Sequence, residues 1–172
     1  MTEYPFSSMD VAVVPADPQQ EPVFAALTQL YVYDFSELLK LEIADDGRFQ
    51  FDRYRAYWTD ARYRPFLIRT SGHLAGFVVV DAVSRLTDEP LWDMSQFFVL
   101  RRHRTAGVGA CAAAAAFDLF PGRWEVRVEA LNAPAQAFWR KVVSRYTDGH
   151  YSEIAWSDDR FHGLVFRFET VR

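Results

Sequence analysis

The chain has 172 residues, of which 50% are hydrophobic and 24% are charged, and its formal net charge is −4 at pH 7. This composition excludes a disordered chain, and the negative charge argues against a nucleic-acid partner, whose phosphates need a basic face. The length suits a fold that buries most of its apolar surface, so we expect a single domain over residues 1–172.

The single cysteine and the lengths of the apolar runs further limit the class of protein. Cys111 is the only cysteine, which excludes an intramolecular disulfide. With no basic residue beside it, we expect a small packed side chain rather than a nucleophile. No apolar run approaches the roughly 20 residues of a membrane span, and Met1–Asp10 lacks the pattern of a signal peptide. We therefore expect a cytoplasmic protein with no membrane partner.

The chain begins with a predicted strand, Val11–Val14, in a β-rich run. A helix is predicted to open at Asp17 and Pro18, because apolar residues recur after them at helical spacing. Those residues are Phe24, Leu27, Leu30 and Tyr31.

Further helical segments are predicted before the central strands. One starts near Asp34 and includes Leu38, Leu39 and Ile43. A turn follows at Asp46-Gly47, and another helical piece is expected over Arg53–Trp58.

Three strands are predicted in the middle of the chain. Pro65–Thr70 and His73–Val83 flank Ser71-Gly72, which is typical of a hairpin turn because glycine reaches positive φ without strain. Leu91–Leu100 is the third strand, and its apolar end predicts burial on both faces.

The last part of the chain alternates helices and strands. Five successive alanines favour a helix from about Val108 to Phe120, and Trp124–Ala130 alternates as a half-buried strand does. Asn132 caps a second helix, and Tyr151–Trp156 and Phe161–Phe168 form a closing hairpin. Together the elements predict an α/β domain with a mixed sheet of about seven strands and helices on its faces.

The most informative motif is R-x-x-G-x-G at residues 104–109, between a hydrophobic strand and the alanine-rich helix. A helix N-terminus after a basic glycine turn suits an anionic ligand, and the arginines of residues 101–104 suffice for one phosphorylated ligand. The motif is neither a nucleotide-triphosphate loop nor the dinucleotide G-x-G-x-x-G pattern. Alone, such a turn is more often structural. The histidines lack metal-ligand spacing, so no metal is expected, and the G-x-S-x-G pattern of a nucleophilic serine does not occur.

A second motif, N-A-P-A-Q-A-F-W from Asn132, follows the glycine turn, and the pair resembles the GNAT superfamily of acetyl-CoA-dependent N-acetyltransferases. The resemblance implies a single-domain, mostly antiparallel sheet with a splayed central strand pair. It implies transfer of an acetyl group from acetyl-CoA to a primary amine of a small molecule or protein, with a homodimer possible. Two alternatives stay open: a non-catalytic acyl-CoA-binding sensor or interaction module on the same fold, and a domain whose glycine turn binds no cofactor.

The resemblance also implies a binding site for acetyl-CoA. Backbone groups of Phe97, Phe98 and Val99 would bond the pantetheine arm as an added strand does. The pyrophosphate would accept hydrogen bonds from backbone N–H groups of the turn, because glycines without a β-carbon let these groups approach the phosphate closely. These are the N–H groups of Arg104, Thr105, Ala106, Gly107, Val108, Gly109 and Ala110. Asn132 would open the second cofactor-side helix, and the role of a plain N-cap is equally compatible with this position. Phe138 would either cover the pantetheine or join the core.

Catalysis in such a family means attack of a neutral amine on the thioester, so a general base is wanted. Asp93, at the start of the central strand, and Glu129, near the end of the next strand, are the candidates, although either suits a solvated surface carboxylate. Trp139 stands where the family commonly has a tyrosine, so the usual general-acid role does not transfer. Water alone suffices if the acceptor is weakly basic.

The acceptor side is expected to come from the first third of the chain. This part is rich in aromatic and acidic residues, which suit a cationic amine. The aromatic residues are Tyr31, Tyr33, Phe35, Phe49, Phe51, Tyr54, Tyr57 and Trp58, and the acids are Glu37, Glu42, Asp45, Asp46 and Asp52. The alternative for both groups is a core with a solvated face.

Overall fold

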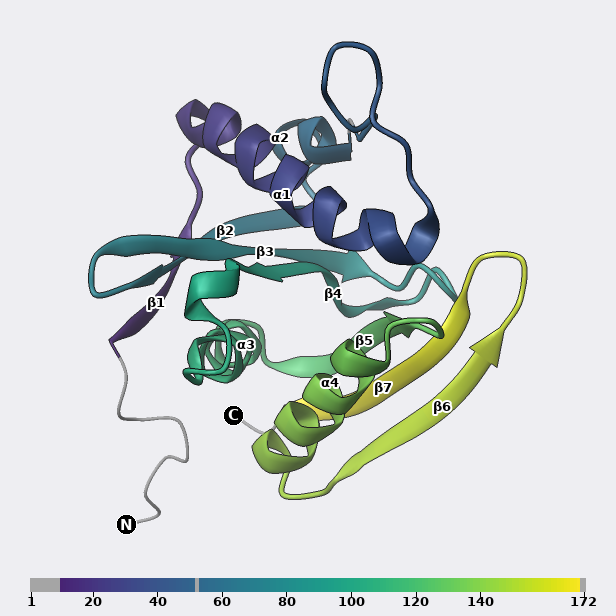
Figure 1. The fold of residues 1–172 in the computed structure, drawn as a ribbon. Helices are drawn as coiled ribbons and strands as arrows, with labels where there is room; N and C mark the ends of the chain where they lie inside the picture. The colour runs from purple at the N-terminus through teal and green to yellow at the C-terminus, as the bar shows by residue number, and fades with distance from the viewer. Residues whose placement is uncertain (1–9, 52, 171–172) are drawn as a thin grey trace.

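The computed structural model describes residues 10–51 and 53–170 (Figure 1). The strands are β1 (Val11–Pro15), β2 (Tyr63–Thr70), β3 (His73–Val83), β4 (Pro90–Val99), β5 (Gly122–Glu129), β6 (Tyr151–Ser157) and β7 (His162–Thr170). The α-helices are α1 (Glu21–Leu39), α2 (Ala56–Thr59), α3 (Val108–Leu119) and α4 (Ala133–Tyr146). Short 3₁₀ helices cover Pro18–Gln20, Arg53–Arg55 and Arg101–His103.

The strands form one seven-stranded sheet in the order β1-β2-β3-β4-β5-β7-β6. Neighbouring strands are antiparallel except β4 and β5, which are parallel. A parallel pair needs a long crossover, and here α3 makes that crossover over one face of the sheet. The predicted mixed, mostly antiparallel sheet of seven strands is confirmed.

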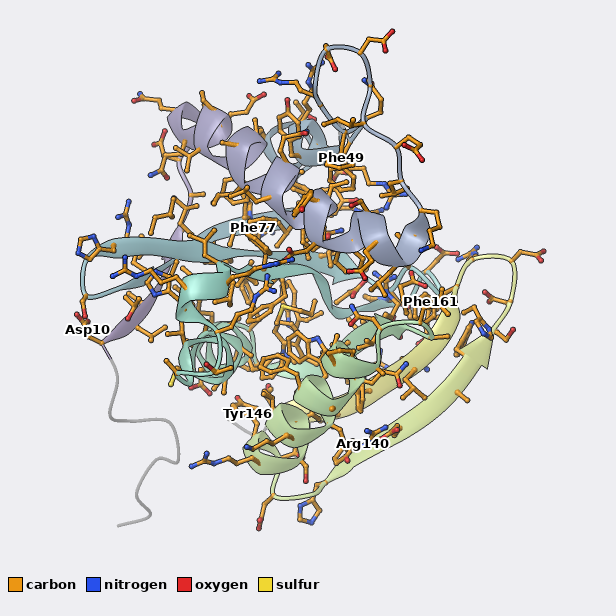
Figure 2. All side chains as sticks on the ribbon, viewed as in Figure 1. Asp10, Phe49, Phe77, Arg140, Tyr146 and Phe161 are labelled. Carbon is orange, nitrogen blue, oxygen red and sulfur yellow. The ribbon has the colours of Figure 1, made fainter. Side chains whose placement is uncertain are left out.

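Helices cover both faces of the sheet, α1 and α2 on one and α3 and α4 on the other (Figure 1). Each face has its own apolar core. The α3 and α4 face is filled by large side chains such as Phe117 and Trp124. On the α1 and α2 face, Phe24 packs edge-on against Tyr57 and at 5.3 Å between ring centroids against Phe77, which lies between α1 and the sheet in Figure 2.

The region around Asp34 differs from the prediction. A separate helix was expected to start there and to include Ile43, but α1 continues without a break through Leu39. No glycine or proline follows Pro22 within the helix, so the sequence has nothing to interrupt it. The helix ends at Lys40, whose left-handed φ of 52° is typical of a helix C-terminus. Ile43 therefore lies in the following loop.

The parallel pair β4–β5 is short, and it determines where a ligand can enter the sheet. Only Trp92 with Trp124 and Asp93 with Glu125 are in register. Beyond that point β4 stays paired with β3 up to Val99, and β5 stays paired with β7 up to Glu129. Each strand is thus held on its outer edge while the inner edges diverge, and the predicted splay of the central pair is confirmed.

Gly76 allows the tight approach of β3 and β4 next to this opening. A β-carbon at Gly76 would overlap the carbonyl oxygen of Phe98. We expect Gly76→Ala to lower the free energy of unfolding by about 2–3 kcal/mol, because an overpacked sheet must shift backbone. Urea denaturation checks this value.

Gly47→Ala is the control, since a β-carbon at Gly47 has no atom within 4 Å and meets only the strain of its φ of +75°. We expect this variant to lose about 1 kcal/mol. Equal losses in the two variants would show that the contact with Phe98 does not limit the packing of β3 on β4.

Candidate active site

The turn before α3 presents a row of unpaired backbone N–H groups. Thr105 and Gly107 have positive φ values of 65° and 85°, which turns successive N–H groups toward one side. Within residues 10–51 and 53–170, the N–H groups from Thr105 to Ala110 have no hydrogen-bond partner. The N–H of Arg104 instead donates to the carbonyl of Arg101 at 3.2 Å. Arg104 was expected to offer its N–H to a ligand, whereas in this structure that N–H is already engaged.

The arginines before the turn are bound by a residue that the sequence analysis did not identify. Asp34, on α1, accepts hydrogen bonds from Arg101 at 2.8 Å and from Arg104. The Nε of Arg104 also donates to the carbonyl of Val99 at 2.7 Å. Arg102 has no ion pair in the part of the chain that the structure describes. The sequence does contain a signal for the role of Asp34, because it is the only charged residue between Glu21 and Glu37.

The end of β4 supplies both a free edge and aromatic walls. Phe98 faces α1 and joins the core there, while Phe97 faces the opposite side. The Phe97 ring stacks on Phe138 of α4 with centroids 5.9 Å apart, and a β-carbon at Gly109 would lie 3.2 Å from the same Phe138 ring. Thus β4, α3 and α4 meet at one point beside the splay, and Phe138 is half-buried there.

Asn132 and Trp139 have structural roles in α4. The side-chain oxygen of Asn132 accepts the N–H of Ala135 at 3.1 Å, which confirms the N-cap. Trp139 is 6% exposed, with its ring centroid 5.0 Å from that of Phe97. The residue in the tyrosine position is therefore part of the core.

Asp93 is the last residue of β4 that pairs with β5, and it is fully buried. Its Oδ2 accepts from Nη2 of Arg127 at 2.8 Å, whereas its Oδ1 is buried with no hydrogen-bond partner among the described residues. Burial raises the pKa of Asp93 from 3.8 to about 6, although the charge of Arg127 acts in the opposite direction. A carboxylate without access to solvent has no direct path to an acceptor in this structure.

Glu125, which pairs with Asp93 across the two strands, is a second fully buried carboxylate. It accepts from Arg167 at 2.7 Å and from the hydroxyl of Ser84 at 3.0 Å. Arg127 lies 3.8 Å from it, so one guanidinium serves both carboxylates. This network was not predicted from the sequence, although Glu125, Arg127 and Glu129 alternate on one face of the predicted strand.

Glu129 is exposed, and it lines a cavity of about 550 Å³. Arg127 lines the same cavity; both residues belong to the part of β5 that has separated from β4. Phe161 closes another side, near the loop between β6 and β7 (Figure 2). Of the two carboxylates predicted as bases, the structure gives only Glu129 a place in a cavity.

The aromatic and acidic residues expected around an acceptor do not line this cavity. Tyr31, Tyr54, Tyr57 and Trp58 pack together in the core beneath α1. The acids Glu37, Glu42, Asp45 and Asp46 are exposed, and Asp52 lies outside the described residues. The alternative of a core with a solvated face describes most of these residues, although Asp46, Phe49, Phe51 and Tyr54 line a second, smaller cavity of about 170 Å³.

Among residues 10–51 and 53–170, no helix has both the length and the apolar character that a membrane crossing requires. The same residues contain no group of three or more histidine, cysteine, aspartate or glutamate side chains arranged to hold a metal ion.

Comparison with known proteins identifies the family. The model of the acetyltransferase (GNAT) family matches residues 25–143. The fold is similar to an acetyltransferase from Thermus thermophilus, with a TM-score of 0.67 and 18% identity over 94% of this chain and 98% of that one. No curated protein gives a significant sequence match.

Two solved structures with bound coenzyme A also share the fold. Spermidine N-acetyltransferase from Vibrio cholerae, in complex with CoA and spermine, has a TM-score of 0.57 and 13% identity over 93% of this chain and 95% of that one. RimL, a ribosomal L7/L12 α-N-protein acetyltransferase in complex with CoA, has a TM-score of 0.58 and 12% identity over 97% and 96%. The chain belongs to the GNAT acetyltransferase family. Its class is that of an acetyl-CoA-dependent N-acetyltransferase, as the sequence motifs predicted.

The pKa of Asp93 predicts a dependence of stability on pH. Because the folded-state value, about 6, lies above the ordinary 3.8, the folded protein binds this proton between those pH values while the unfolded chain does not. The contribution of Asp93 to stability therefore decreases as the pH rises through that window.

Urea denaturation of the wild type and Asp93→Asn checks this sign. The difference in free energy of unfolding, wild type minus variant, should decrease from about pH 4 to about pH 7 and stay level above it. A difference that increased over the same range would mean that Arg127, rather than burial, dominates the pKa.

Proposed function

We propose that the protein transfers the acetyl group of acetyl-CoA to a primary amine of a small molecule or a protein, at the opening between β4 and β5. The proposal rests on two sets of unpaired backbone groups that lie side by side. The free N–H groups of residues 105–110 lie beside the free inner edge of β4, which begins where the two-residue ladder ends.

The residues present fit coenzyme A. A diphosphate suits the N–H groups from Thr105 to Ala110, because they point from a positive-φ turn and a helix N-terminus. The inner edge of β4 at Phe97–Val99 suits the amide groups of pantetheine, which would bond to it as a strand does and would share the Val99 carbonyl with Arg104. Phe138, half-buried beside Phe97 and Gly109, would cover that arm. Arg102 is available for a further phosphate.

When bound, acetyl-CoA supplies a thioester carbonyl; the amine nitrogen bonds to this carbon, the C–S bond breaks, and the products are an acetamide and the CoA thiol. The amine must lose a proton to attack, and a free alkyl amine has a pKa near ~10.4. We assign this proton to Glu129, directly or through a water, because it lines the cavity and has no ion pair among the described residues. Trp139 is buried and contributes no proton, so the thiolate takes up its proton from water.

A substitution in the turn tests the cofactor site. Gly107→Val should lower the affinity for CoA by about 100-fold, since a β-branched side chain at positive φ displaces the N–H groups of the turn. Isothermal titration calorimetry with CoA measures the effect.

Gly149→Val is the matched control, because Gly149 has a similar φ of 80° in a turn outside the site. It should lose comparable stability and keep its affinity for CoA. Unchanged affinity in a folded Gly107→Val protein would support a domain whose glycine turn binds no cofactor.

A substitution of the base tests the chemistry separately. Glu129→Gln should lower kcat by about 10²–10⁴-fold at neutral pH and leave CoA affinity unchanged, because the amide cannot accept the proton. Release of free thiol over a panel of amines is the measurement, with Glu169→Gln, an exposed residue of β7, as control.

Equal rates in wild type and Glu129→Gln would remove Glu129 from the mechanism. Binding of acetyl-CoA without thiol release for any amine in the wild type would favour the non-catalytic sensor, for which the buried Trp139 is the structural argument.

A further inference from the structure

Five arginines from four separate parts of the chain line the cavity beside Glu129. They are Arg53, Arg62, Arg85, Arg127 and Arg160. We infer that the acceptor carries an anionic group, a carboxylate or a phosphate, close to the amine that is acetylated. The inference rests on the proposed function, since it gives the chemical class of the acceptor for the same site.

The arginines keep hydrogen-bond donors for a ligand. Arg62 donates from Nη2 to Asp81 and to the Tyr63 hydroxyl, and Arg127 donates from Nε and Nη2 to Asp93. Arg85 donates from Nη2 to Tyr63. The Nη1 groups of these three arginines have no partner among the described residues, so each offers an unused donor pair beside the cavity.

Arg53 is the most available of the five. It is exposed and makes no ion pair or hydrogen bond within the described residues. By contrast, Arg160 at the rim is engaged by Asp88 at 2.8 Å. A guanidinium with all its donors free binds carboxylate or phosphate through two parallel hydrogen bonds.

The compensating carboxylates lie behind the arginines rather than in the cavity. Asp81, Asp93 and Glu125 are all 0% exposed. They hold Arg62, Arg127 and Arg167 at 2.7–2.8 Å. An incoming ligand therefore meets guanidinium groups first, with the carboxylates out of reach. Glu129 and the rim residue Asp88 are the two carboxylates that line the cavity.

This arrangement separates two classes of acceptor. A polyamine would bring a second positive charge against five arginines, and desolvated like charges are strongly unfavourable. An amine with an anionic group a few bonds away satisfies both parts of the cavity, with its amine at Glu129 and its anion at the arginines. A volume of about 550 Å³ is typical of sites for small molecules.

Matched pairs of amines test the inference on the intact protein. The first pair is O-phosphoethanolamine and ethanolamine, the second is β-alanine and β-alaninamide, and spermidine serves as the cationic probe. Binding to protein saturated with CoA is measured by calorimetry, and acetyl transfer by thiol release. We expect each anionic member to bind at least about tenfold more tightly than its neutral partner, because it gains charge-assisted hydrogen bonds. Whichever of O-phosphoethanolamine and β-alanine binds more tightly shows whether the site prefers a phosphate or a carboxylate.

Variants of Arg53 locate the effect in this cavity. Arg53→Gln should reduce the preference for the anionic member by about tenfold, because one charged partner is lost. Arg53→Glu should reduce this preference further and should strengthen the binding of spermidine. Arg48→Gln, an exposed arginine outside the cavity, should change nothing. The affinity for CoA should be equal in the wild type and in the three variants.

The outcomes separate this inference from the proposed function. The inference is overturned if the two members of each pair bind equally or if neither anionic probe binds. It is also overturned if Arg53→Gln keeps the wild-type preference. A wild type that prefers the anionic probes but neither binds CoA nor releases thiol overturns the proposed function and leaves the anionic preference established.

Discussion

The opening of the sheet depends on the burial of two carboxylates at the point where β4 and β5 part. Asp93 and Glu125 are the last residues that the two strands pair, and neither is exposed to solvent. Two buried negative charges at adjacent positions repel each other unless a cation is shared between them. Arg127 is that cation, 2.8 Å from Asp93 and 3.8 Å from Glu125. Removing it would leave uncompensated buried charge, which proteins tolerate poorly.

The same arginine connects the fold to the cavity. Arg127 follows Glu125 by two residues, so both side chains lie on the same face of β5, and Glu129 follows by two more. The alternation that makes β5 a strand thus places a buried carboxylate, a bridging guanidinium and an exposed carboxylate in a row. Trp124, Val126 and Val128 point to the opposite face and fill the core beneath α3 and α4. One strand therefore serves packing on one face and chemistry on the other.

Much of the fold follows from local sequence signals. The alternation of β5, the Ser71-Gly72 turn and the alanine run of α3 each predicted an element that the structure contains. The motifs at Arg104 and Asn132 identified the family, because they specify a backbone shape rather than a surface. Local signals fail where contacts join distant segments. Asp34 and Arg104 are 70 residues apart, and the single long helix that brings them together was predicted as two.

The arginine-lined cavity shows the same limit. Its residues come from the segments before β2, after β3, along β5 and before β7, and no spacing in the sequence relates them. Composition pointed instead to the aromatic and acidic first third, where proximity along the chain was mistaken for proximity in space. Only the path of the sheet places Arg53 near Glu129.

The buried indole at position 139 has a consequence for how the reaction responds to alkali. Tryptophan holds its N–H at every pH that a folded protein survives, so nothing at that position titrates. An alkaline limb in a rate profile would thus report a group other than residue 139, such as the acceptor amine. The departing sulfur would then take its proton from solvent and not from the side chain at position 139.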